Sequence, residues 1–147
     1  MAVLLAPLAS TYLSSAQPAE PGKPLVLERT IRLDGVAGRI DHMAVDLGRK
    51  RLLVAELGND SVDVVDLASG KAIHRITGLK EPQGVAYLPG PDLIVVASAG
   101  DGSVRLFKGA DAVPDGVVDL GDDADNVRVD PSTGHVKIGR ASCRERV

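Results

Sequence analysis

The chain has 147 residues, which is enough for one domain. Its apolar fraction of 44%, its charged fraction of 25% and its formal net charge of −3 are ordinary for a globular protein and argue against the basic face that nucleic-acid binding needs. The only aromatic residues are Tyr12, Tyr87 and Phe107, and the single cysteine, Cys143, excludes an intrachain disulfide and a cysteine-rich zinc site.

Residues 1–24 have the features of an export signal followed by a linker. Ala2–Leu8 is a short apolar run, and Ser14-Ser15-Ala16 places small residues at the −3 and −1 positions of a cleavage site. No basic residue precedes the apolar run, and the run is far shorter than the roughly 20 residues that cross a bilayer. Gln17–Pro24, with its three prolines, is expected to be a stiff linker. The sequence therefore predicts a periplasmic or secreted protein with no stable membrane span. The alternatives are an unstructured apolar N-terminus and a start codon inside a longer reading frame.

The chain then repeats itself with a period of 42 residues. After a segment, Leu25–Leu33, that alternates apolar and polar residues and is expected to form a strand, the first copy begins at Met43 and the second at Val85 (85 − 43 = 42). A third copy begins at Val127. Identical residues at equivalent positions of the first two copies are Gly48/Gly90, Val54/Val96, Ala55/Ala97, Gly58/Gly100, Ser61/Ser103, Val62/Val104 and Ala68/Ala110. Self-similarity at about 40–45 residues is typical of β-propeller blades, as in WD-type repeats.

Each copy is expected to form four strands. Apolar runs of four to six residues alternate with turn residues, and Val62 and Val64 lie on the opposite strand face from Asp63 and Val65. The expected strands are 42–46, 51–57, 61–66 and 71–77 in the first copy, and 83–88, 92–98, 103–108 and 112–120 in the second. An α/β fold is disfavoured because no segment of sufficient length has a helical period, and a β-sandwich would not explain a gapless repeat.

The sequence thus predicts an all-β fold of propeller blades, each with four antiparallel strands. Residues 25–137 would form two blades and part of a third, with repeats at 43–84, 85–126 and 127–137 and an incomplete ring. Residues 138–147 break the repeat and resemble the translation of a common sequencing adapter, so we expect them to be an artefact tail that includes Cys143. The chain would then be the N-terminal piece of a longer propeller. The alternative is a genuine basic tail.

Leu53–Lys71 resembles the YVTN-type (YncE-like) β-propeller repeat. Asn59–Asp66 resembles its Asn-(Ser/Thr)-Val-x-Val-Ile-Asp segment, with Asp60 as one additional residue and Val65 in place of isoleucine, and Ser69-Gly70-Lys71 resembles its Thr-Gly-Lys turn. Leu53–Glu56 stands where the family has Tyr-Val-Thr-Asn and keeps only the valine. The resemblance extends over about residues 39–136 and implies a ring of about seven blades. Such propellers serve many roles, so the resemblance implies a fold and no particular activity.

The candidate site lies where each copy enters its first strand. Asp41-His42, Gln83-Gly84 and Asp125-Asn126 occupy equivalent repeat positions, and propeller ligands usually bind at the channel mouth formed there. In propeller lactonases, Glu, Asn and Asp hold a divalent metal at such a place, and oxygen ligands suit Ca²⁺ or Mg²⁺. Asp41, His42, Asp125 and Asn126 are therefore weak candidate metal ligands. The alternative is that they bind backbone N–H groups of their own loops.

No catalytic or cofactor-binding residue can be assigned from the sequence. The leading hypothesis is a binding or scaffold module of the bacterial cell envelope, with an unknown protein or small ligand at the propeller rim or channel and no nucleic acid. The alternative is a fragment of a propeller enzyme, either a metal-dependent lactonase-like hydrolase or a quinoprotein-like oxidoreductase, with its site in further blades. A third possibility is that the fragment has no function of its own.

Overall fold

The computed structural model describes residues 25–140. The predicted export signal and linker, and the part of the predicted tail that contains Cys143, lie outside the described residues. The chain divides into two units, residues 1–30 and 31–147, and every described strand belongs to the second. Within residues 25–140, no helix is long and apolar enough to cross a membrane.

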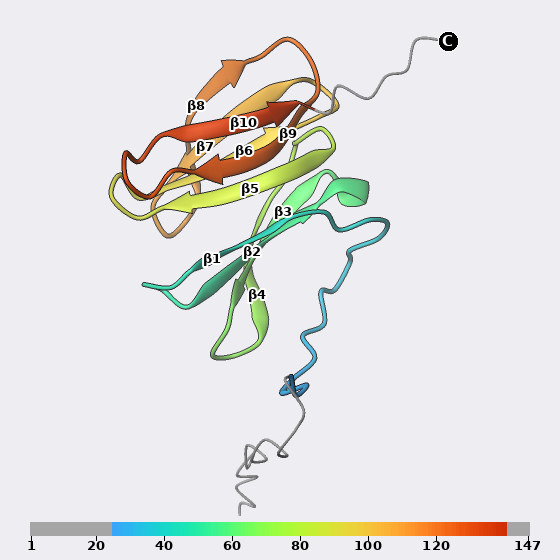
Figure 1. Ribbon diagram of the computed structural model, residues 1–147. Coiled ribbons are helices and arrows are strands. Elements are labelled where there is room, and N and C mark those ends of the chain that lie inside the picture. Colours follow the sequence, from blue (N-terminus) through green and yellow to red (C-terminus); the bar gives the residue numbers. More distant parts are fainter. Residues whose placement is uncertain (1–24, 141–147) are drawn as a thin grey trace, which may run out of the picture. The chain divides into compact units, whose positions relative to one another are not determined.

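The described chain is all-β, with its strands in three antiparallel sheets (Figure 1). The first sheet contains β1 (Met43–Asp46), β2 (Arg51–Glu56), β3 (Ser61–Asp66) and β4 (Lys71–Ile76), the second contains β5 (Pro82–Leu88), β6 (Leu93–Ser98), β7 (Ser103–Lys108) and β8 (Val113–Asp119), and the third pairs β9 (Ala124–Val129) with β10 (Val136–Arg140). Each sheet follows chain order, so neighbouring strands are joined by short turns. One 3-10 turn, η1 (Leu57–Asn59), connects β2 to β3.

The three sheets confirm the predicted fold class. β2 and β6 begin at Arg51 and Leu93 (93 − 51 = 42), and β3 and β7 begin one period apart at Ser61 and Ser103. The register also repeats, because Ala55 lies opposite Val62 in the first sheet and Ala97 lies opposite Val104 in the second. Each period therefore forms one four-stranded, blade-like sheet. None of the three described sheets closes into a barrel, which is consistent with an incomplete propeller.

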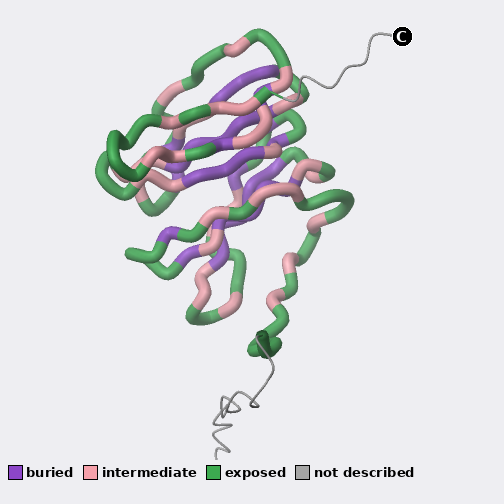
Figure 2. Tube along the Cα trace, in the orientation of Figure 1, coloured by how far each residue is buried: buried purple, intermediate pink, exposed green. Residues whose placement is uncertain are grey.

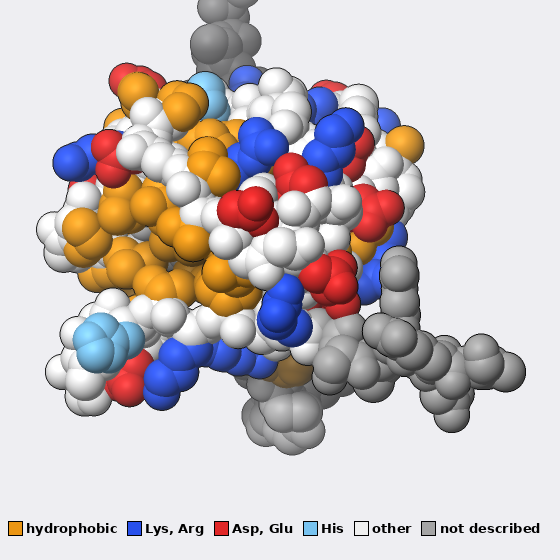
Figure 3. Space-filling model, turned by 90° about the horizontal axis from the view of Figure 1, so that it is seen from above, with side chains coloured by type: hydrophobic (Ala, Val, Ile, Leu, Met, Phe, Trp, Pro, Cys, Tyr) orange, Lys and Arg blue, Asp and Glu red, His pale blue; other side chains and the backbone are white. Residues whose placement is uncertain are grey.

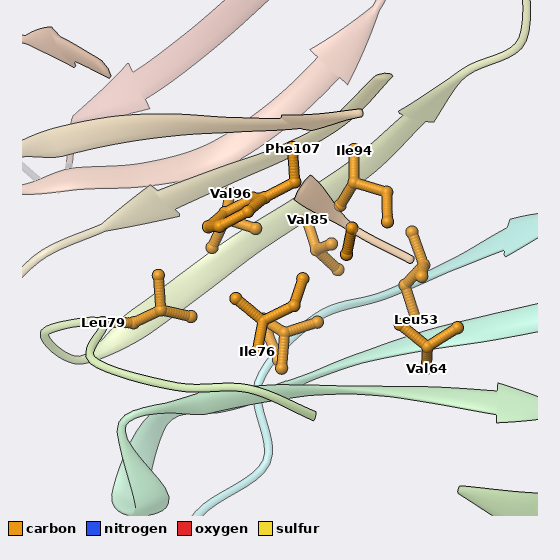
Figure 4. Close-up of a cluster of buried hydrophobic side chains, with 11 residues drawn as sticks. Leu53, Val64, Ile76, Leu79, Val85, Ile94, Val96 and Phe107 are labelled. Carbon is orange, nitrogen blue, oxygen red and sulfur yellow. The ribbon is translucent and has the colours of Figure 1, made fainter. Parts of the chain in front are cut away.

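Sheets stack through two hydrophobic clusters. The first lies between the first and second sheets (Figure 4) and contains the buried side chains of Leu53, Ala55, Val62, Val64, Ile76, Leu79, Val85, Ile94, Val96, Phe107 and Ala112. The second lies between the second and third sheets and contains Ala86, Val95, Ala97, Val104, Ala124 and Val127. In β6, Ile94 and Val96 belong to the first cluster and Val95 and Ala97 to the second. The second sheet is therefore apolar on both faces of β6. Burial is concentrated along β2, β3, β5 and β6, whereas β8 is exposed (Figure 2).

One face of the first sheet is less covered than its counterpart in the second. Met43 and Val45 are 59% and 48% exposed, whereas Val85, which is equivalent to Met43, is only 5% exposed. Further exposed apolar side chains are Leu47, Ile73, Val113, Val117 and Val118. Figure 3 looks down on the side where β8 and β10 lie in Figure 1, and it shows hydrophobic side chains gathered over part of that side, bordered by charged groups.

The segment that enters each four-stranded sheet is hydrogen-bonded to the turn between the second and third strands of that sheet. Gly100 N–H donates to Lys80 O (3.1 Å) in the second repeat, and Gly58 N–H donates to Arg39 O (3.0 Å) in the first. The segment before β1 thus does in the first sheet what the β4–β5 connection does in the second. The strand predicted over Leu25–Leu33 is wrong, because residues 25–42 contain no strand. β4 pairs only with β3, and an alternating segment becomes a strand only where a neighbour pairs with its backbone.

The third sheet passes the predicted boundary at residue 137. β10 continues through Ile138, Gly139 and Arg140, and Ile138 packs against the second cluster. The Arg140 side chain donates to Leu120 O (2.6 Å) and Asp122 O (3.1 Å). The first three residues of the predicted tail therefore continue the strand.

Candidate functional site

The structure brings the predicted positions of adjacent repeats together through their backbones. His42 N–H donates to Gln83 O (3.3 Å), which joins the entry of β1 to the entry of β5. One repeat later, a Cβ atom added to Gly84 would lie 2.1 Å from Asp125 O. The first strands of the three sheets thus lie side by side, as a propeller channel requires (Figure 1).

The side chains of the four metal candidates do not gather into one group. Nδ1 of His42 lies 3.1 Å from Oδ1 of Asp41, and Oδ2 of Asp41 accepts a hydrogen bond from Arg39. Oδ1 of Asn126 is buried without a hydrogen-bond partner, and the buried Nδ1 of His42 lies within ion-pair distance of Asp41 but makes no well-oriented hydrogen bond. Among residues 25–140, no group of three or more histidine, cysteine, aspartate or glutamate residues could hold a metal ion. The assignment of Asp41, His42, Asp125 and Asn126 as metal ligands stays a prediction.

A pocket of about 350 Å³ lies at the C-terminal ends of β1 and β5, away from the strand entries that contain His42 and Gln83. It is formed where the β1–β2 turn of the first sheet approaches the end of β5 in the second. Its lining residues are Val45, Asp46, Leu47, Gly48, Arg49, Tyr87 and Pro89. The pocket therefore combines apolar side chains with the guanidinium group of Arg49, the carboxylate of Asp46 and the phenol of Tyr87.

Arg49 joins the two sheets beside this pocket. Its two Nη atoms bind Oδ1 and Oδ2 of Asp92, each at 2.8 Å, and Nη1 also donates to the Tyr87 hydroxyl. The hydroxyl in turn donates to Asp92 Oδ1 at 2.9 Å. Hydrogen bonds from Arg49, and then from Tyr87, hold the pKa of Asp92 below its usual value. Burial, and then the hydrogen bond to Asp92, raise the pKa of Tyr87, so it stays a neutral donor.

A second arginine lies beneath the first. Arg51 is 3% exposed, and its Nη2 and Nε lie 2.8 Å and 3.1 Å from Oδ2 of buried Asp46. The guanidinium carbons of Arg49 and Arg51 both lie 5.9 Å from the centre of the Tyr87 ring, within range of a cation–π contact. Burial alone would raise the pKa of Asp46, but hydrogen bonds from Arg49 N–H and Arg51, with the charge of Arg51, bring it below its usual value. The site is preorganised by paired charges.

The pH dependence of the unfolding free energy below neutral pH tests the pairing of Asp46 with Arg49 and Arg51. Because the folded-state pKa of Asp46 is lowered, its contribution to stability is present above the unfolded pKa and is lost as pH falls through the folded value. We expect Asp46→Asn to make the loss of unfolding free energy shallower as urea titrations move from neutral to acid pH. Asp111→Asn, at an exposed position, should leave the slope unchanged. Equal slopes for wild type and Asp46→Asn would contradict the assignment.

Sequence reasoning missed the Arg49, Tyr87 and Asp92 cluster. Arg49 and Asp92 lie in turns of different repeats, 43 positions apart in the chain, and turn residues are ordinarily solvated. The available signal was Tyr87, an aromatic residue at the repeat position that Val45 and Val129 occupy in the other copies.

Comparisons with known proteins support the fold. No model of a known protein family matches the sequence, and no curated protein matches it at a significant level. Hydrazine synthase of Kuenenia stuttgartiensis, a propeller-containing protein, matches the structure with a TM-score of 0.64 at 16% sequence identity, over 76% of this chain. The chain spans only 33% of the length of that structure. Hydrazine synthase is one of 202 chains of known structure that match. At 16% identity, this likeness shows the fold alone. These findings show a β-sheet fold similar to that of a propeller-type protein.

Proposed function

We propose that the chain is a YVTN-type propeller module of the bacterial cell envelope that binds a small ligand or a side chain of a partner protein. The observation that carries the proposal is the pocket beside Arg49 and Tyr87, between the ends of β1 and β5. Concave sites with apolar walls and a few fixed polar groups are typical of ligand binding. Val45, Leu47 and Pro89 supply the apolar wall, and Arg49, Asp46 and Tyr87 supply the fixed polar groups. The export-like residues 1–24 support an envelope location.

Ligand screening by NMR tests the pocket directly. We expect fragments that combine an apolar ring with a neutral hydrogen-bonding group to shift the amide signals of Gly48 and Arg49 and the ring signals of Tyr87. A neutral group is expected because the guanidinium group of Arg49 is already paired with carboxylates. Arg49→Ala removes the charge and should weaken such a fragment about tenfold, which corresponds to about 1.4 kcal/mol, an ordinary value for a hydrogen bond to a charged group. Lys108→Ala, at an exposed position outside the pocket lining, is the control. Shifts that map elsewhere, or binding unchanged in Arg49→Ala, would overturn the assignment.

The second candidate is part of a propeller enzyme. It is supported by Oδ1 of Asn126, which is buried without a hydrogen-bond partner, and by the Asp41–His42 pair at the equivalent entry to the first sheet. Metal retained after dialysis, lost in His42→Ala and accompanied by lactone hydrolysis, would favour this candidate over the binding module. Titration with Ca²⁺ or Mg²⁺ that shifts only the pocket signals, or none, would count against it.

A further inference from the structure

Two carboxyl groups are buried side by side in the first sheet. Glu56 ends β2 and Asp63 lies within β3, and both are 0% exposed. The Ser61 hydroxyl donates to Oε2 of Glu56, and Nδ2 of Asn59 donates to the Ser61 hydroxyl at 2.9 Å. Buried carboxyl groups without full pairing are costly, so the charge state of this pair needs a physical explanation.

Within residues 25–140, Arg75 is the cation that faces the two carboxyl groups. Nε and Nη2 of Arg75, from β4, donate to Oδ1 and Oδ2 of Asp63 at 2.6 Å and 2.7 Å. Nη2 of Arg75 also donates to the backbone carbonyl of Asp34, at 2.9 Å. Asp63 therefore has its counter-ion, and the same arginine holds the segment that enters the first sheet.

One carboxyl oxygen of Glu56, Oε1, is buried and has no hydrogen-bond partner. An ionised Glu56 would have no donor at this oxygen, because a carboxylate such as Asp63 can only accept hydrogen bonds. A protonated carboxyl group removes this difficulty, because it donates one hydrogen bond. Burial raises the pKa of Glu56, the Ser61 hydrogen bond lowers it, and the charge of Asp63 and a hydrogen bond to Asp63 raise it further. The net direction is upward, although Arg75 opposes it.

The second sheet shows the same attachment without the second carboxyl group. There Nη1 of Arg105, from β7, donates to Gly78 O (3.1 Å) in the incoming connection, and Asp101 is its counter-ion at 3.1 Å. Ser98 occupies the position that is equivalent to Glu56. An arginine bound to the incoming backbone is thus common to both sheets, and the extra acid belongs to the first sheet alone.

We propose that the carboxyl group of Glu56 is protonated at neutral pH and donates a hydrogen bond to Asp63. Glu56, Asp63 and Arg75 then form a proton-dependent clasp on the segment that enters the first sheet. When Glu56 loses its proton, Glu56 and Asp63 are both negatively charged and share the guanidinium group of Arg75. The hydrogen bond from Arg75 to the Asp34 carbonyl is then weakened. The other polar groups here are Ser61 and Asn59, which are neutral, while the Arg39 side chain is paired with Asp41. Above the transition the incoming segment separates from the β2–β3 turn.

The sign of the pH dependence follows from the raised pKa of Glu56. The folded chain holds this proton more tightly than the unfolded chain does. The contribution is therefore complete below the unfolded pKa and is lost as pH rises through the folded value. Glu56→Gln keeps the size and a donor of the protonated acid, so the clasp should stay closed at every pH.

Hydrogen exchange of the Gly58 amide reports on the clasp, because this amide binds Arg39 O in the incoming segment. After correction for intrinsic exchange, we expect its protection in wild type to fall at least about tenfold from acid to alkaline pH, an opening shift of about 1.4 kcal/mol. Glu56→Gln should hold its protection constant. Glu81→Gln, at an exposed position, is the matched control and should follow wild type. Constant protection in wild type, or an equal fall in Glu56→Gln, would overturn the proposal.

A second measurement needs no variant. The side-chain carboxyl carbon of Glu56 should show the chemical shift of a protonated acid at neutral pH in ¹³C-labelled wild type. A carboxylate shift for Glu56 at neutral pH would overturn the proposal even if Glu56→Gln failed to fold.

Discussion

Replacing Gly84 with alanine should cost on the order of 3 kcal/mol of unfolding free energy or more, a value at the upper end for overpacking. The added Cβ would lie 2.1 Å from Asp125 O and 2.8 Å from the backbone nitrogen of Val127. Both atoms belong to β9, so no side-chain rotation relieves the overlap. β9 must move away from β5, which opens the second hydrophobic cluster. Urea unfolding followed by circular dichroism measures the change.

Gly90→Ala is the matched control. Gly90 lies in the β5–β6 turn, and an added Cβ would meet nothing within 4 Å. We expect a change within about 0.5 kcal/mol, as for most surface substitutions. Similar losses for Gly84→Ala and Gly90→Ala would contradict the close approach of the first strands and would mean that β5 and β9 do not lie side by side.

Leu53→Ala should lower the unfolding free energy by about 2–5 kcal/mol, the range for truncating a buried leucine. Leu53 is 0% exposed and belongs to the cluster between the first and second sheets. The truncation removes contacts with side chains of both sheets, so the loss includes a cavity that rigid strands cannot close. Denaturant titration at neutral pH gives the value.

Leu47→Ala removes the same atoms from a side chain that is 83% exposed. This variant should stay within about 0.5 kcal/mol of wild type. Comparable losses at positions 47 and 53 would show that the first sheet does not pack against the second through Leu53, whatever the strands do individually.

The period and the strands could be predicted because both are local properties of the sequence. Alternation in Val62–Val65 assigns the side chains of β3 to its two faces, and turn residues such as Gly58 mark where strands end. The observed β2 ends at Glu56, one residue before the predicted bound. The prediction for Leu25–Leu33 was wrong because alternation describes a segment and says nothing about whether a partner strand is beside it.

The candidate site was only partly accessible to sequence reasoning. The repeat identified Asp41-His42 and Gln83-Gly84 as equivalent positions of neighbouring copies, and in the structure the backbones of His42 and Gln83 are hydrogen-bonded. It gave no indication that Arg49 reaches Asp92, because that contact joins two turns at non-equivalent positions. The repeat also gave no indication that the carboxyl group of Glu56 lies beside that of Asp63 in the neighbouring strand. The equivalent position of the next repeat is a serine, Ser98. Pairings of this kind depend on three-dimensional packing.

The stacking of the 42-residue sheets is tested most directly by nuclear Overhauser effects between methyl groups of the labelled chain. Contacts between methyl groups of Leu53 or Val64 in the first sheet and Ile94 or Val96 in the second are expected, since all four belong to one cluster. Methyl contacts confined to each sheet, or linking Leu53 to residues outside the second sheet, would contradict the account.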